Sequence, residues 1–188
     1  MTFRIITSIS MWDENGCYIE NENGILPNIN DEEAVEVALS NLAAQADDTY
    51  FDGTITFEIK GKPFYDNSFS TSALLMTWET LIRFKDYEEN GVASIPFLDL
   101  ATDFLIVFCE QGYQLKTFHS ECEVDENNII LSSETTDVLS EIIPKKLFKQ
   151  EIKRACGVFI KFCEKNHLPV NANELDSLKK SYYRYIGG

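Results

Sequence analysis

Histidine and the common catalytic motifs are scarce or absent in this sequence. Its only histidines are His119 and His167, so a mechanism that depends on imidazole chemistry has little material. The chain contains no glycine-rich phosphate loop, no Gly-x-Ser-x-Gly nucleophile elbow and no His-Glu-x-x-His metal motif. We therefore expect a protein that is not an enzyme and that needs no cofactor.

Long apolar runs and paired cysteines are missing as well. The longest apolar run covers residues 104–109, far short of the roughly 20 residues that span a bilayer. The first ten residues have neither the positive lead-in nor the apolar stretch of a secretion signal. The five cysteines are irregularly spaced, include no Cys-x-x-Cys pair and cannot all pair within one chain. These features predict reduced thiols in a cytoplasmic protein that does not enter a membrane.

Positive charge is scarce only in the first three quarters of the chain. Residues 1–143 contain 27 Asp and Glu against 6 Lys and Arg, a balance of −21. Residues 144–188 contain 4 Asp and Glu against 10 Lys and Arg, a balance of +6. Such an uneven distribution of charge affects the partners and the solubility of a protein rather than its fold. We expect one domain, 1–188, with an acidic α/β body at 1–143 and a basic helical C-terminal segment at 144–188.

Apolar periodicity predicts both strands and helices. Residues 3–10 and 54–59 alternate with a period of two, and residues 104–132 resemble a three-stranded meander. Helical spacing predicts one helix at 31–45, a second from a cap at 70–72 to about residue 90, and helices from 137 onward. We predict an α+β fold in which an antiparallel sheet of about five to six strands packs with helices and the C-terminus is helical.

Two acidic clusters are candidate partner-binding surfaces. The first lies at the C-terminal end of the second predicted helix, where the helix dipole makes negative charge unfavourable. Its members are Asp86, Glu88 and Glu89. Charge in an unfavourable place suggests that it is there for a functional reason. The second alternates along a predicted strand, so its side chains would share one face. Its members are Glu121, Glu123 and Asp125.

The second cluster also permits a chemical interpretation. Together with His119, its carboxylates could hold a divalent ion or transfer a proton, which would make the protein a metal-dependent enzyme. Cys109 and Cys122 could also meet beside this histidine across a hairpin and supply a nucleophile. A solvated outer face and buried thiols are the simpler interpretation, so we predict neither a metal nor a catalytic residue here.

The lysine-rich face of residues 145–165 is the third charged feature. It could contact nucleic acid or an anionic membrane. The acidic body carries more than three times its charge and would repel polyanions outside a Debye length of about 8 Å at physiological salt. We therefore expect this face to lean toward the acidic body, and we predict no binding of nucleic acid or membrane.

A small acidic α+β chain of this profile resembles the immunity proteins that bacteria keep against their own secreted toxins, many of which are basic nucleases. The resemblance concerns the overall profile of the whole chain. It implies a protein that neutralises a basic protein partner, its cognate toxin, through an acidic surface that steers fast association. A metal-dependent enzyme built on His119 and its neighbouring carboxylates is one alternative. A DNA-mimicking regulator, with acids spaced like phosphates, is the other.

Overall fold

Antiparallel strands and flanking helices make up the computed structural model. It describes residues 1–12, 18–19, 26–44, 50–65, 69–98, 104–124 and 130–187, and the structural statements below concern these residues. The first sheet has the order β1-β4-β5, with β6 also pairing with β4. Its strands are β1 (Phe3–Ile9), β4 (Gly53–Ile59), β5 (Lys62–Pro63) and β6 (Phe69–Thr71). The α+β class is confirmed, but the strands are divided between two main sheets rather than collected in one.

The second sheet has the order β10-β9-β8-β7, and β11 pairs with β9 beside β10. Its strands are β7 (Val92–Ile95), β8 (Phe104–Phe108), β9 (Gly112–Val124), β10 (Ile130–Leu139) and β11 (Ile143–Pro144). A separate ribbon joins β2 (Met11–Trp12) to β3 (Tyr18–Ile19), and the Asn15-Gly16 turn predicted between them lies outside the described residues. The predicted meander is confirmed in β8, β9 and β10, although the turn at 125–128 is not described.

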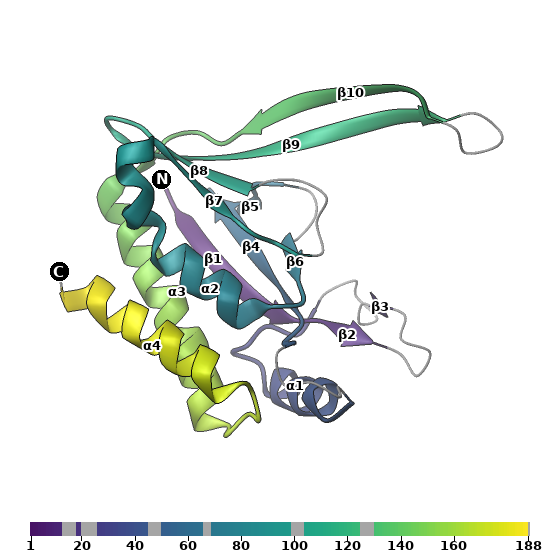
Figure 1. Ribbon diagram of the computed structural model, residues 1–188, viewed down its shortest axis with the longest axis vertical. Coiled ribbons are helices and arrows are strands. Elements are labelled where there is room, and N and C mark those ends of the chain that lie inside the picture. Colours follow the sequence, from purple (N-terminus) through teal and green to yellow (C-terminus); the bar gives the residue numbers. More distant parts are fainter. Residues whose placement is uncertain are drawn as a thin grey trace.

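Helices cover one side of these sheets. They are α1 (Glu32–Ala44), α2 (Leu74–Ile82), the 3₁₀ helix η1 (Phe84–Asn90), α3 (Lys145–Lys165) and α4 (Ala172–Gly187). Figure 1 shows α3 lying along the strands, α4 outside it, and the β9–β10 hairpin projecting away from the helices. No helix among the described residues is both long and apolar enough to cross a membrane.

A cluster of phenylalanine rings joins the two sheets. Phe57 of β4 stacks on Phe104 of β8 with ring centroids 4.6 Å apart, and Phe69 of β6 lies 4.7 Å from the same Phe104 ring. All three side chains are buried. Each ring of this size buries about 150–250 Å² of surface, and ring pairs add about 0.5–1.5 kcal/mol beyond that burial. The cluster therefore connects sheets that share no backbone ladder.

The helix α3 packs on the same core because its apolar residues repeat at helical spacing. Phe148, Ile152, Cys156, Phe159 and Cys163 are all buried. Phe148 stacks on Phe3 of β1, with ring centroids 5.3 Å apart. The basic C-terminal segment thus shares one hydrophobic cluster with the acidic body.

Two predicted boundaries were wrong. The strand β10 continues to Leu139, where helix was predicted from residue 137, because Thr135, Thr136 and Val138 favour a strand over a helix. Ser70 and Thr71, which were predicted to cap the second helix, instead belong to β6, and α2 begins at Leu74. The predicted stop near Gly91 is confirmed at the end of η1, because this glycine has a left-handed φ of 73°.

Tyr113, near the start of β9, supports a prediction about alkaline stability. The side chain is fully buried, its hydroxyl has no hydrogen-bond partner within the described structure, and burial raises its pKa to about 12. An unfolded tyrosine ionises near 10, so the unfolded chain loses this proton first. The stability linked to Tyr113 is complete below pH 10 and is lost as the pH rises toward 12.

We expect Tyr113→Phe to raise the free energy of unfolding by about 1 kcal/mol at pH 7, because it removes a buried, unpaired hydroxyl. It should also reduce the loss of stability in alkali. Urea unfolding of both proteins at pH 7 and at about pH 10.5 measures the two effects. A variant less stable than the parent at pH 7 would show that the hydroxyl is satisfied in solution.

Candidate functional site

The members of the first predicted acidic cluster differ in their contacts. The Asp86 carboxylate accepts hydrogen bonds from Arg83 Nε at 3.0 Å and from Arg184 Nη2 at 2.8 Å, which raises the pKa of the Arg83 guanidinium. Glu88 and Glu89 are exposed and belong to none of the ion pairs in the described part of the chain. Asp86 therefore has an internal role, whereas the two glutamates remain available to a partner.

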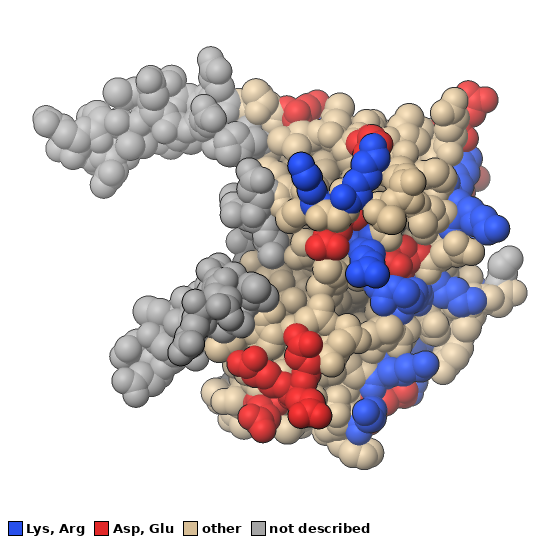
Figure 2. Space-filling model, turned by 180° about the vertical axis from the view of Figure 1, so that it is seen from behind, with Lys and Arg blue, Asp and Glu red and all other residues tan. Residues whose placement is uncertain are grey.

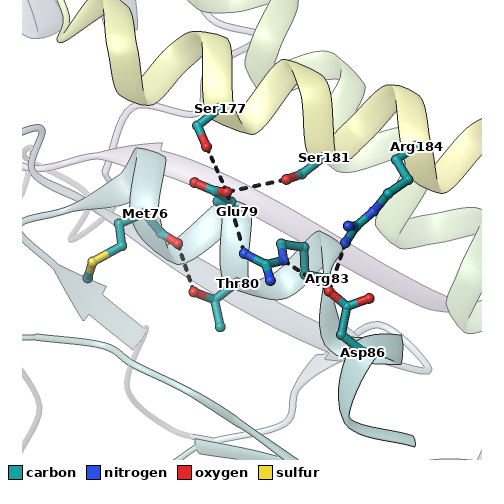
Figure 3. A network of polar contacts seen from close by, with 8 residues as sticks. All are labelled: Met76, Glu79, Thr80, Arg83, Asp86, Ser177, Ser181 and Arg184. Atoms are coloured by element: carbon teal, nitrogen blue, oxygen red, sulfur yellow. Dashed lines mark hydrogen bonds and ion pairs between the residues drawn. The ribbon is translucent and has the colours of Figure 1, made fainter.

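The contacts of Asp86 belong to a network that fastens α4 to α2 and η1 (Figure 3). Glu79 of α2 accepts hydrogen bonds from the hydroxyls of Ser177 and Ser181 at 2.9 and 3.3 Å. Arg184, one helical turn further along α4, reaches Asp86 of η1. Asp86 therefore helps to position α4 on η1, and its role in partner binding stays a prediction.

The second predicted cluster lies far from the first. Phe84 of η1 contacts Tyr113 near the start of β9, with ring centroids 5.1 Å apart. Glu121 is eight residues further along that strand, about 26 Å at the usual strand rise. Glu121 pairs with Glu134 in the β9–β10 register, Glu123 pairs with Ser132, and Asp125 lies outside the described residues. The described backbone thus places Glu121 and Glu123 of β9 well apart from the acids of η1.

A third acidic group lies at the start of α1. Its members are Asp31, Glu32, Glu33 and Glu36, all of them exposed. They form the red patch over α1 in Figure 2. Acids at a helix start are favoured by the helix dipole, which accounts for Glu32 and Glu33 in the first turn. Four exposed acids within six residues exceed what a helix start needs.

The lysine face of α3 lies near this patch without neutralising it. Lys161 and Lys165 line a hollow of about 340 Å³ together with Asp31 and Glu32. Within the described structure, the ion pair of Arg184 with Asp86 connects the basic segment to the acidic body at an exposed position. Other cations of the segment pair within it, as Lys179 does with Glu164 at 2.6 Å. The lysine face therefore leans toward the acids of α1 at this hollow, as expected, although the ion pairs of the described structure join none of its lysines to them.

A cavity of about 510 Å³ lies between α3 and the outer edge of β1. Its polar wall is Glu151 of α3, whose side chain is only 10% exposed. The Glu151 carboxylate accepts hydrogen bonds from the Ile5 backbone N–H at 2.8 Å and from Arg154 at 2.6 and 2.8 Å. Arg154 in turn donates to the Ile5 carbonyl at 3.1 Å. This ion pair thus occupies the backbone groups of an edge strand.

Residues 27–29 complete the closure of the β1 edge. The Ile29 N–H donates to the Thr7 carbonyl at 3.1 Å, and the Ile9 N–H donates to the Pro27 carbonyl at 3.0 Å. An exposed strand edge can pair with other chains, and covering it prevents this. We missed Glu151 and Arg154 in the sequence because their partner is a backbone 146 residues away, which no local spacing reveals.

The metal and thiol alternatives both centre on His119 and its neighbours. Among the described side chains, no three His, Cys, Asp or Glu residues are grouped closely enough to hold a metal ion. The side chains of His119, Glu121, Cys122 and Glu123 lie outside that description. Cys156 and Cys163 are buried, and burial raises the pKa of both thiols, which keeps them protonated. Comparisons of this chain with protein-family models, curated proteins and solved structures gave no match.

Proposed function

We propose that this chain is an acidic binding protein without catalytic activity that neutralises a basic protein partner, as immunity proteins do for bacterial toxins. The observation that carries the proposal is a set of exposed carboxylates that belong to no ion pair within the described structure. They are Glu88 and Glu89 on η1, and Asp31, Glu32, Glu33 and Glu36 on α1.

The placement of the basic residues strengthens this interpretation. A net charge of −15 opposes compact folding through self-repulsion, and the ten Lys and Arg of residues 144–188 could relieve it. Figure 2 shows the blue side chains gathered along α3 and beside the red patch over α1 rather than interleaved with it. The acidic field therefore persists on the surface, where it can steer a cationic protein to association rates of about 10⁸–10⁹ M⁻¹s⁻¹ at low salt.

Glu88 and Glu89 also stand on a firmly held support. Phe84 of η1 is fully buried and packs on Phe148 and Tyr113, with ring centroids 5.2 and 5.1 Å away. Gly91 then ends η1 in a left-handed conformation. Groups fixed before binding lose less conformational entropy when the partner docks.

The proposal predicts a partner that is basic, harmful when alone and captured through charge. We expect the immobilised chain to retain one basic protein from a lysate of its source cell at about 50 mM salt, and less of it at about 500 mM. Expressed alone, that protein should arrest growth, and co-expression of this chain should restore it. Retention of many DNA-binding proteins, or of none, would overturn the proposal.

Charge reversal then locates the steering surface. We expect Glu88→Lys/Glu89→Lys to slow association with the purified partner at least tenfold at low salt and less at high salt. The double variant Glu32→Lys/Glu33→Lys makes the same change in charge on α1 and is the matched comparison. Stopped-flow association rates measure both. Unchanged rates in both variants would remove these carboxylates from the binding process.

A further inference from the structure

The outer part of the β9–β10 hairpin extends beyond the sheet that carries it. The pairing of β8 with β9 ends at Lys116, which is opposite Leu105. From Thr117 to Val124, β9 pairs with β10 and with no other described strand. Figure 1 shows this hairpin projecting beyond the ends of β7 and β8. An isolated two-stranded hairpin is only marginally stable in water, so this element lacks the support that the other strands have.

The register shows which backbone groups of β10 face outward. The Ser140 N–H donates to the Leu115 carbonyl at 2.9 Å, so Ser140 directs its backbone toward β9. The pairing is regular from Leu139 opposite Lys116 to Ser132 opposite Glu123. Alternate residues of a strand direct their backbone groups to opposite edges. Ser133, Asp137 and Leu139 therefore direct their N–H and C=O groups away from β9.

This outer edge is unusual in the fold. Residues 27–29 and the Glu151–Arg154 pair cover the edge of β1. The strands β5, β6 and β7 have only two, three and four residues. In contrast, β10 has ten residues, about 33 Å, and contains no lysine, arginine or proline. Short strands, covering segments, lysine and proline protect many edges and are absent from β10, whose charged residues are Glu134 and Asp137 and whose register shifts only between Ile130 and Ser132.

The charge of the hairpin indicates what could pair with this edge. Residues 117–139 contain six Asp and Glu and no Lys or Arg. Asp137 is neutralised by Lys116 at the base of the hairpin, with Nζ and Oδ2 2.6 Å apart. Further out, Glu121 and Glu134 are directly opposite in the register, and like charges so placed destabilise a strand pair. A second copy of the chain would bring six more acids, whereas a cationic strand would relieve the repulsion.

We propose that β10 is the docking edge of this protein and that it accepts an extended segment rich in lysine or arginine from a protein partner as an added strand. The proposal rests on the proposed function and assigns a binding surface to it. Backbone hydrogen bonds along β10 supply affinity, and the acids of the hairpin select a cationic segment. The acids on η1 and α1 then act at longer range as steering charges.

A ten-residue peptide of alternating lysine and valine is the probe, with alternating glutamate and valine as its control. We expect the full chain to bind the lysine peptide, and we expect amide hydrogen exchange to slow in residues 130–139. Ser133→Pro removes one outward N–H and keeps the β9 ladder, and it should raise the Kd at least tenfold. Ser133→Ala keeps that N–H and should change the Kd less than twofold.

A charge-reversed pair gives a second test that does not depend on proline. Glu121→Lys/Glu134→Lys should raise the Kd of the lysine peptide at least tenfold, whereas Glu32→Lys/Glu33→Lys, with the same change in charge, should raise it less than threefold. Protection of η1 or α1 in place of β10, or a chain that dimerises through β10, would overturn this proposal and leave the proposed function standing. Absence of any binding by the lysine peptide at low salt would count against both.

Discussion

Phe57→Ala is expected to lower the free energy of unfolding by about 4 kcal/mol, within the range measured for the truncation of buried phenylalanines. Phe57 is 1% exposed and lies where the two main sheets meet, between Phe104 and Phe69. Truncation leaves a cavity that neither sheet can close, because each is held by its own ladder. Urea unfolding at pH 7, followed by tryptophan fluorescence and by circular dichroism, measures the loss.

Phe64→Ala is the matched control for this prediction. Phe64 belongs to the same cluster, 6.4 Å from Phe104 between ring centroids, but it is only partly buried. Its truncation removes less buried surface and should cost less than half as much. If the two variants lost equal stability, or if Phe57→Ala lost under about 1.5 kcal/mol, the ring cluster would not be what joins the sheets.

Removal of the Glu151 carboxylate is the second change with a large expected effect. Glu151→Ala should lower the free energy of unfolding by about 3 kcal/mol, because it leaves the Ile5 N–H and the Arg154 guanidinium without their acceptor. Glu151→Gln keeps an oxygen that can accept from the Ile5 N–H, and it should lose less. Urea unfolding of both variants measures the difference.

A double-mutant cycle separates the ion pair from its parts. Removal of both partners in Glu151→Ala/Arg154→Leu leaves no unpaired charge, so this variant should be more stable than Glu151→Ala alone. Arg154 is half-exposed, and its single truncation should therefore cost less than that of Glu151. Additive losses in the cycle would show that the two side chains act independently at the β1 edge.

Regular elements were predictable from the sequence wherever one face is consistently apolar. The strand β1 and the helix α3 follow their expected periods closely, because each lays a single stripe on the core. The second predicted helix was less accurate, since α2 ends at Ile82 and the chain continues as η1. Apolar spacing alone cannot distinguish an α-helix from a 3₁₀ helix that continues the same face.

The sequence predicted the candidate site correctly only for residues whose side chains are simply exposed to solvent. Glu88 and Glu89 are on the surface, as their position at the end of the second predicted helix suggested. Asp86 is engaged by Arg184, a residue 98 positions later, and the sequence contains no sign of that pairing. The separation of the two acidic clusters follows from the length of β9 beyond β8, which depends on where a neighbouring strand stops.

The closure of β1 also has a consequence for synthesis of the protein. The acceptor of the Ile5 amide is 146 residues further along the chain. At about 5–20 residues per second, the ribosome needs roughly 7–30 s to add that many residues. During that time the nascent strand has an apolar face and an edge left uncovered at Ile5, and both favour association with other chains. A chaperone that binds extended apolar segments near the ribosomal exit is therefore expected to raise the yield of this protein.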